Sequence, residues 1–284
     1  MNRLPPVLII TVNFRRPDCT LAFLQSAAQL DDFECCHVVV VDNNSGDDSI
    51  SHIQRAVKRF ENVNLLASPE NRGYFHAAKH AFDSFLEENC TPDWVIICNN
   101  DILFDRRSFL TELVSHDPNS IGVLAPAVIS EITGLDSNPM IAKKPGMLRI
   151  LRYRFLLSNY LVARLTQRMA PLVRQLRHRL RDFAESSEGR SRQIYAPHGA
   201  MLVFSRTFFQ RGGSIDDGSF LFGEEIGVAE TCLRIGLPII YDSRLHVLHK
   251  DNQTTGRALT AETYRHQKLG LQYAISKYLS AQHE

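Results

Sequence analysis

Short apolar runs alternate with segments of helical periodicity through the first part of the chain. The runs predict four strands, at Val7–Val12, Val38–Val41, Asn64–Ala67 and Trp94–Cys98. The segments between them predict helices, because apolar residues recur there every three or four positions: Thr20–Leu30, Asp48–Phe60 and Phe75–Glu88. This alternation is typical of an α/β fold in which a mostly parallel central sheet carries helices on both faces.

The second half of the chain has a less regular pattern. Apolar and β-branched residues predict a strand at Tyr195–Phe204 and another at Pro238–Tyr241. Helical periodicity predicts a helix at Glu225–Ile235 and a closing helix at Ala261–Leu279.

Polar and acidic residues follow two of the predicted strands directly. Trp94–Cys98 runs into Asn99, Asn100 and Asp101, and Val38–Val41 runs into Asp42. Open α/β sheets bind their ligands at the carboxyl ends of strands. With a Glu-Glu pair and a histidine far downstream, this arrangement suggests a nucleotide at one edge of the sheet and a metal ion beside it.

Length, charge and cysteine content narrow the class of protein. The 284 residues are enough for one large domain, and a formal net charge of +1 argues against nucleic-acid binding through bulk charge. The six cysteines form no C-x-x-C pair, as is typical of reduced thiols in a cytosolic protein. We interpret Val7–Val12 as a strand rather than a signal peptide, and no stretch approaches the roughly 18 apolar residues of a membrane span. The expected location is therefore cytoplasmic.

Residues 137–181 contain eleven Lys or Arg residues and no Asp or Glu. Apolar residues recur among these arginines at three- and four-residue steps: Leu165, Met169, Leu172, Val173, Leu176, Leu180 and Phe183. The pattern predicts a basic amphipathic helix within an insertion at about 137–185. Its apolar stripe could pack on its own domain. The alternative is an anionic membrane surface, with the protein peripheral at the inner face of the plasma membrane, where each basic residue contributes roughly 1 kcal/mol.

Seven short stretches occur in one order along the chain: Thr11–Phe14, Val41–Ser45, Glu70–Tyr74, Asn99–Asp101, His198–Met201, Asp216–Glu225 and Val247–His249. Together they resemble the family 2 glycosyltransferases of GT-A fold, especially the rhamnosyltransferase-like members. The resemblance implies a GT-A domain over residues 1–256 that contains the basic insertion, followed by a C-terminal helix over 257–284.

The same resemblance implies a nucleotide-binding set, which is Thr11, Asn13, Asp42, Asn71, Arg72, Gly73 and Asn99. Asp42 would contact the base or ribose of the nucleotide. The turn from Asn71 to Gly73 would close over the diphosphate, and Arg72 would add positive charge. The donor is expected to be a UDP- or dTDP-linked sugar.

A divalent ion, Mg²⁺ or Mn²⁺, is implied beside the diphosphate. In the family pattern Asp101 would coordinate this ion and His249 would approach it from the other side. A hard cation held by oxygen ligands stabilises the negative charge that grows on the departing diphosphate. Many relatives have two acids at this point, whereas this chain has Asn99 and Asn100 before the single Asp101.

An acceptor hydroxyl is a poor nucleophile at neutral pH, so a carboxylate must take its proton. Glu225 stands where the family places this base, and Glu224 is the near alternative; the sequence does not choose between them. Gly199, Ala200 and Asp216 are implied around the donor or acceptor sugar. The resemblance implies a single displacement with inversion at the anomeric carbon.

Three hypotheses about function follow. The leading one is a metal-dependent glycosyltransferase that acts on a hydroxyl acceptor, such as a lipid-linked glycan, in surface polysaccharide or glycolipid assembly. A sugar nucleotidyltransferase would need a Gly-rich loop after the first strand, and Thr11–Arg16 contains no glycine. The third hypothesis is a degenerate, non-catalytic sugar-nucleotide-binding protein. The joint presence of Asp42, Asp101, Glu225 and His249 argues against it.

Overall fold

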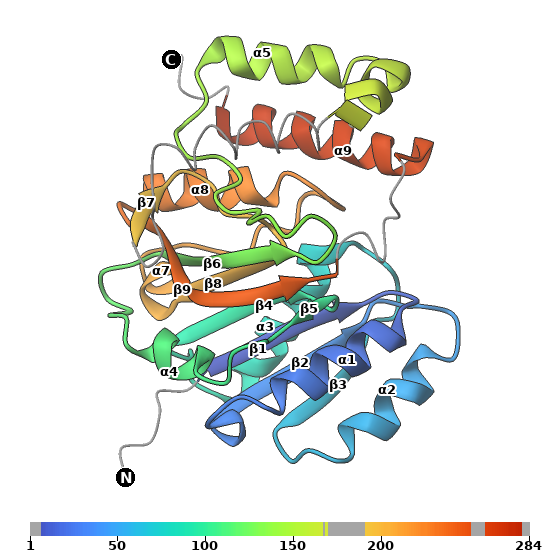
Figure 1. Cartoon of the computed structure of the whole chain (residues 1–284), viewed down its shortest axis with the longest axis vertical. Helices are drawn as coiled ribbons and strands as arrows, with labels where there is room; N and C mark the ends of the chain where they lie inside the picture. Colours follow the sequence, from blue (N-terminus) through green and yellow to red (C-terminus); the bar gives the residue numbers. More distant parts are fainter. Residues whose placement is uncertain (1–6, 167, 170–190, 251–258, 280–284) are drawn as a thin grey trace.

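The computed structural model describes residues 7–166, 168–169, 191–250 and 259–279, and in this part of the chain nine strands form one sheet (Figure 1). The strands are β1 (Val7–Asn13), β2 (Cys36–Asp42), β3 (Val63–Ala67), β4 (Trp94–Asn99), β5 (Ile102–Leu103), β6 (Val123–Ser130), β7 (Arg192–Ile194), β8 (Met201–Ser205) and β9 (Ile239–His249). Their order is β3-β2-β1-β4-β8-β6-β9-β5, and β7 pairs with β9. The predicted α/β fold is confirmed.

Helices cover both faces of the sheet. They are α1 (Pro17–Ala27), α2 (Ser49–Val57), α3 (Tyr74–Glu88), α4 (Phe109–Val114), α5 (Met147–Leu156), α7 (Arg206–Gln210), α8 (Glu224–Arg234) and α9 (Ala261–Ala274), with short turns at Phe33–Cys35 and Ile275–Leu279 (η2, a π-helix). Alternate strand residues point to opposite faces. Val7 and Ile9 therefore pack with α1, α2 and α4, while Leu8 and Ile10 pack with α3, α7 and α8.

The first four long strands are mutually parallel, and their register aligns their carboxyl ends. Asn13 lies opposite Asp42, and Val12 lies opposite Asn99. All seven residues of β1 are buried, because helices cover both of its faces. The polar residues that end these strands therefore gather at one edge of the sheet, as the sequence predicted.

The second half of the sheet is mixed. β8 runs antiparallel to β4 and β6, and β9 runs parallel to β6 but antiparallel to β5 and β7. The prediction of a single strand at Tyr195–Phe204 is wrong, because β7 ends at Ile194 and β8 begins at Met201. Pro197 and Gly199 lie between them; a proline cannot donate to the ladder, and a glycine weakens it.

A layer of helices lies outside α8. In Figure 1, α5 lies at the top of the molecule, above α9, which in turn lies above α8. Tyr160 Oη donates a hydrogen bond to the Leu259 carbonyl at 2.9 Å, and Tyr264 Oη donates to the Leu157 carbonyl at 2.9 Å. The predicted closing helix is confirmed as α9 and η2, which are continuous in sequence.

The predicted basic helix is described only at its beginning. Residues 160–166 are helical, whereas 170–183, which carry most of its apolar stripe and arginines, lie outside the described residues. Within the described part of the chain, no helix combines the length and apolar character needed to cross a membrane.

Candidate active site

Buried polar side chains join the carboxyl ends of β1 and β2. Asp42 is fully buried, and its Oδ1 accepts hydrogen bonds from Asn13 Nδ2 at 2.7 Å and from Ser45 Oγ at 2.6 Å. Its Oδ2 accepts a further bond from the Ser45 backbone N–H at 3.1 Å. Such bonds are required because an unsatisfied buried carboxylate is costly. Thr11, two residues before Asn13 on β1, is also buried.

A second set of bonds ties this network to α1 and β4. Asn13 Oδ1 accepts from Thr20 Oγ1 at 3.0 Å and from Asn100 Nδ2 at 3.2 Å. Asn99, which ends β4, donates its backbone N–H to the Ala200 carbonyl at 2.9 Å. The strand ends that the sequence singled out are therefore joined to one another and to the segment before β8.

The turn from Asn71 to Gly73 is fixed from both sides. Asn71 Oδ1 accepts hydrogen bonds from Asn43 Nδ2 at 2.9 Å and from the Gly73 backbone N–H at 3.1 Å. Gly73 has a φ of +102°, and a Cβ there would collide with the Phe220 carbonyl. The turn lies directly against the segment that precedes α8, and only glycine leaves room for this contact at a positive φ.

Arg72 lies at the outer rim of this turn. Its side chain is 56% exposed and pairs with Glu70 at 2.8 Å, a surface contact that a ligand can replace at low cost. A cavity of about 260 Å³ lies beside it, lined by Arg72, His76, Lys79, His80, Asp83 and Asp217.

Asp101 and His249 meet from different strands. Ile102 of β5 is paired with His249 at the end of β9, which brings Asp101 next to the imidazole. Asp101 Oδ1 lies 3.1 Å from His249 Nε2, and both side chains are buried. Asp101 Oδ1 accepts no hydrogen bond from the residues that the structure describes. We call these two residues the Asp101–His249 pair.

The donor atoms of this pair fit a divalent cation. A buried carboxylate oxygen and a facing imidazole nitrogen are both common metal ligands. Among the described residues, no group of three or more His, Cys, Asp or Glu side chains could hold an ion. Cations such as Mg²⁺ that keep water and phosphate oxygens in most positions need only one or two protein ligands, which the Asp101–His249 pair could supply.

Glu224 and Glu225, the acid pair, begin α8 and lie against the Gly199 backbone. A Cβ on Gly199 would lie 2.8 Å from Glu225 Oε1 and 3.3 Å from Glu224 Oε1. The Gly199 carbonyl accepts a long hydrogen bond from Tyr74 Oη at 3.5 Å, and the ring of His198 lies 5.9 Å from that of His249. His198–Ala200 therefore lies between the acid pair and the Asp101–His249 pair.

The two carboxylates of the acid pair differ in electrostatic environment. Burial and then the charge of Glu225 raise the pKa of Glu224 well above its ordinary value. Burial also raises the pKa of Glu225, but the backbone N–H groups of Glu225, Gly223 and Gly199 oppose the rise. A pair of this kind titrates as a unit, and its first negative charge is better held on Glu225. Glu225 is thus better equipped to accept a proton.

Asp216 is bound by protein side chains. It was expected near the donor or acceptor sugar, but both carboxylate oxygens accept hydrogen bonds from the end of the closing helix, from Tyr273, Lys277 and Tyr278. The prediction that it contacts a sugar stays a prediction, whereas its partners in the structure are protein side chains.

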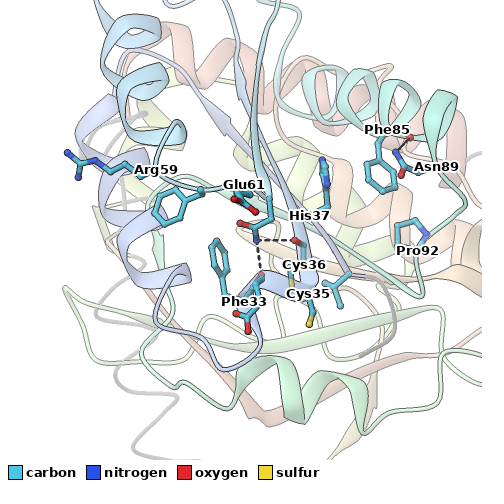
Figure 2. A pocket seen from close by; sticks show the side chains of 13 residues that line it. Phe33, Cys35, Cys36, His37, Arg59, Glu61, Phe85, Asn89 and Pro92 are labelled. Carbon is cyan, nitrogen blue, oxygen red and sulfur yellow. Dashed lines mark hydrogen bonds between the residues drawn. The ribbon is translucent and has the colours of Figure 1, made fainter. Parts of the chain in front are cut away.

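Figure 2 shows a larger cavity of about 660 Å³ at the opposite edge of the sheet. Its lining includes Val7, Cys36 and His37, which lie at the amino ends of β1 and β2, together with Phe33, Glu34, Cys35, Arg59, Phe60, Glu61, Asn62, Phe85, Asn89 and Pro92. The candidate active site lies at the carboxyl ends of the same strands, so the cavity is separate from it.

Comparison with known sequences decides the family. Residues 8–161, more than half of the chain, match the sequence model described as Glycosyl transferase family 2. The chain belongs to this family. It is therefore a glycosyltransferase, as the motifs at its strand ends predicted.

Relatives of this glycosyltransferase include an N-acetylglucosaminyl-diphospho-decaprenol L-rhamnosyltransferase of Mycobacterium tuberculosis. The two are 25% identical over 244 residues, which cover 81% of this chain and 72% of the relative. The rhamnosyltransferase-like resemblance is thus confirmed.

Solved structures support the GT-A fold. The mannosyltransferase PcManGT of Pyrobaculum calidifontis, in complex with GDP-Man and Mn²⁺, has a TM-score of 0.55 and 17% identity, covering 99% of this chain and 74% of that one. GalNAc-T7 with UDP, GalNAc and Mn²⁺ has a TM-score of 0.62 and 11% identity, covering 96% of this chain and 48% of that one.

Three site residues were not among those predicted from the sequence of this glycosyltransferase. Ser45 and Asn100 complete the network around Asn13. Tyr74 lies among acidic groups: burial, and then Coulombic interactions with Cys98, Glu224, Asp101 and Glu225, raise its pKa well above the ordinary value. Ser45 and Asn100 both stand beside predicted site residues at strand ends, a signal that could have identified them.

We predict that Glu224→Gln stabilises the folded protein at alkaline pH. The pKa of Glu224 is raised on folding, so its ionisation costs stability above both pKa values and costs nothing below the unfolded value of about 4.3. The gain should be roughly 1.4 kcal/mol for each unit of the shift.

The melting temperature of Glu224→Gln should exceed that of the wild type at pH 8, and the difference should shrink towards pH 4. Glu262→Gln, which changes an exposed glutamate at the start of α9, should show little difference at either pH. A Glu224→Gln protein that melts below the wild type at pH 8 would contradict the electrostatic assignment.

Proposed function

We propose that the protein transfers a sugar from a nucleoside diphosphate sugar to a hydroxyl acceptor, with inversion at the anomeric carbon. The observation that carries this proposal is the position of His198–Ala200 between the Asp101–His249 pair and the acid pair. A cation site and a proton acceptor then lie on two sides of one short segment. This spacing suits a single displacement, in which the leaving group and the nucleophile are assisted at the same time.

The relatives support the donor and acceptor classes. PcManGT was solved with GDP-Man and Mn²⁺, and GalNAc-T7 with UDP, GalNAc and Mn²⁺. The rhamnosyltransferase is named for a sugar acceptor joined by a diphosphate to decaprenol. By extension, this enzyme would use a UDP- or dTDP-linked donor and a lipid-linked glycan acceptor, in surface polysaccharide or glycolipid assembly.

The ends of β1 and β2 would bind the nucleotide. Asp42 is fully buried, so it would act chiefly by holding Asn13 and Ser45 in place at the pocket edge. The turn that contains Arg72 and Gly73 would lie over the diphosphate, where the exposed guanidinium can exchange its surface partner for phosphate oxygens.

Asp101 and His249 would hold Mg²⁺ or Mn²⁺. When bound, such an ion stabilises the negative charge on the departing nucleoside diphosphate. Asp101 brings a buried oxygen that faces the His249 imidazole and accepts no hydrogen bond from the described residues, so a cation would supply a further partner for it.

Glu225 would act as the general base. Its carboxylate would take the proton of the acceptor hydroxyl while that oxygen forms a bond to the anomeric carbon. The bond from the anomeric carbon to the diphosphate oxygen would break, and its electron pair would leave with the nucleoside diphosphate. Glu224, which burial and its neighbour favour in the protonated form, would remain a spectator to this proton transfer.

An anionic membrane surface is the second partner in this proposal. The outer helical layer exposes large apolar side chains, with Leu148 84%, Phe155 69% and Leu161 69% exposed. Arginines 149, 152, 154 and 164 lie among them in a stretch without acidic residues. Apolar side chains ringed by basic ones suit insertion between anionic headgroups. The enzyme would then act as a peripheral protein at the cytoplasmic face, close to a lipid-linked acceptor.

The first test is a ligand screen. Thermal stabilisation by UDP, dTDP and GDP with Mn²⁺ should identify the nucleotide, because a ligand that binds only the folded state raises apparent stability. Transfer from the matching sugar nucleotides to lipid-linked and soluble acceptors should follow. Nucleotide binding without turnover on any acceptor would favour a non-catalytic binding protein.

We predict that Asp101→Asn abolishes or severely reduces transfer and leaves the fold intact. The substitution removes the carboxylate of the Asp101–His249 pair while preserving its shape, and chelation with EDTA should have the same effect on the wild type. Initial rates with and without EDTA measure this. Near-normal turnover of Asp101→Asn with EDTA present would rule out the metal-dependent mechanism.

We predict that Glu225→Gln lowers turnover by roughly 100-fold or more, the usual scale of general-base catalysis, with little change in nucleotide affinity. Glu224→Gln, the matched control in the next position, should lower it less. Steady-state kinetics with thermal-shift titration of the nucleotide separates the two effects. The reverse ranking would move the base to Glu224, and two silent substitutions would remove the acid pair from catalysis.

We predict that the protein sediments with anionic vesicles at low salt and is released as salt rises, because the basic residues act through a screened potential. Leu148→Ser with Phe155→Ser should weaken sedimentation yet leave transfer to a soluble acceptor intact. Ile50→Ser, an exposed apolar side chain on α2, is the matched control. If wild-type protein stays in the supernatant at low salt, the membrane proposal is wrong, and the alternative is a helix packed on its own domain or on a second subunit.

A further inference from the structure

The segment from Asp216 to Gly223 directly precedes the acid pair and packs between two helical elements. On one side is the start of α3, where the Phe220 carbonyl accepts a hydrogen bond from the Tyr74 backbone N–H at 3.1 Å. Asp217 lies 3.1 Å from the His76 ring on the same side. On the other side is the closing helix, α9 with η2.

The contact with the closing helix centres on Asp216, whose side chain is only 16% exposed. Its Oδ1 accepts hydrogen bonds from Tyr273 Oη and Lys277 Nζ, both at 2.8 Å. Its Oδ2 accepts a bond from Tyr278 Oη. Burial would raise the pKa of this carboxyl, yet hydrogen bonds from Lys277, Tyr278 and Tyr273 outweigh burial and lower it. Asp216 is therefore a charged anchor with three donors from one helix.

Close backbone contact accompanies this anchor. A Cβ on Gly223 would lie 2.6 Å from the Gly270 carbonyl, and a Cβ on Gly227 would lie 3.2 Å from the Tyr278 ring. Side chains at these positions of the segment and of α8 would force the closing helix away. The helix therefore fits directly over the start of α8.

The backbone just before the acid pair is in an unfavourable conformation. Phe222 has a φ of +67° and Gly223 a φ of +92°, so two successive residues lie in the left-handed region. For a bulky residue such as Phe222 this conformation costs about 1 kcal/mol or more, and it persists only where the surroundings impose it. The same turn presents the Gly223 backbone N–H to the Glu225 carboxylate.

We propose that Asp216, Tyr273, Lys277 and Tyr278 form a clamp through which the closing helix positions Glu225 for proton transfer. These four are positioning residues, since their contacts are with the segment that carries the acid pair. The inference rests on the proposed role of Glu225 and adds to it a requirement for a helix that begins 36 residues downstream of that base, at Ala261. It predicts that loosening the clamp changes catalysis before it changes nucleotide binding.

The test is Asp216→Asn, which keeps the size of the side chain and removes its charge. Turnover should fall, by up to roughly 100-fold, the scale expected when a reacting group is misplaced by about 1 Å. The donor KM and the thermal stabilisation by UDP or dTDP with Mn²⁺ should stay within about twofold, because the nucleotide network lies at the ends of β1 and β2.

A pH profile separates positioning from a merely structural role. A displaced Gly223 N–H no longer opposes the rise in the pKa of Glu225, so the acid limb of kcat/KM should move to higher pH than in the wild type. Tyr74 on α3 is a titratable group that faces the acid pair from another element. Asp216→Asn does not alter it.

Tyr278→Phe, which removes one hydroxyl, is the milder variant if Asp216→Asn fails to fold. Lys277→Met should act in the same direction, and combined with Asp216→Asn it should add little, because both remove one interaction. Lys268→Met, on the same helix, is the matched control and should match the wild type.

Two outcomes overturn the clamp. One is a folded Asp216→Asn enzyme with unchanged turnover and acid limb; the other is a loss of turnover that only tracks a loss of folded protein, with the limb unmoved. A wild-type protein that transfers sugar to no acceptor would instead overturn the proposed function, and the clamp would fall with it.

Discussion

A buried carboxylate at the end of β2 determines how the polar network at the ends of β1 and β2 is built. Asp42 is fully buried, so its carboxylate needs donors, and it finds them in Asn13 and Ser45. Asn13 reaches it only because β1 and β2 are parallel and place these residues opposite one another. The Asn13 side-chain oxygen accepts hydrogen bonds from Thr20 and Asn100. These two bonds join α1 and the end of β4 to the same network. Parallel register and charge burial thus produce a rigid pocket edge.

The acid pair differs from Asp42, because its two carboxylates lie side by side in one partly buried place. The electrostatic environments of the two carboxylates are unequal. Backbone N–H groups at the start of α8 and at Gly199 favour the charge of Glu225, while Glu224 keeps a strongly raised pKa. A helix N-terminus favours negative charge, which accounts for an acid pair at this place. Like charges held close cost stability, and active sites commonly bear such a cost.

The sequence predicted those parts of the fold and site that depend on short stretches. The strands β1, β2 and β4 were identifiable because each is a continuous and almost fully buried run, and their polar ends were identifiable because the residues adjoin the runs. Strand β3 was identifiable from a short apolar run, although most of its residues are not buried. Strand β6 was not predicted, since Pro126 interrupts it, and β9 was predicted too short. Between Asp242 and His246 its register shifts against β6, which hides the alternation of apolar residues.

The roles that the sequence could not assign depend on contacts between distant segments. Asp216 stands in the family pattern near the sugar site, yet its partners lie about 60 residues further along the chain, on a helix whose own pattern shows only an apolar face. Tyr74 likewise acquires its surroundings from β4 and α8. In both cases a residue's neighbours along the chain give no information about the charges that fold against it.

The closing helix links the catalytic segment to the outer layer. One of its tyrosines, Tyr264, bonds to the carbonyl of Leu157 at the end of α5, and three side chains at its far end bond to Asp216. The closing helix therefore contacts both the outer helical layer and the segment that precedes Glu225. The polar network around Asn13 and Asp42, by contrast, joins the carboxyl ends of β1 and β2 with α1 and Asn100. In the proposed mechanism, the general base is thus carried by the segment that packs against the closing helix, whereas the nucleotide would be bound at strand ends that belong to the sheet itself.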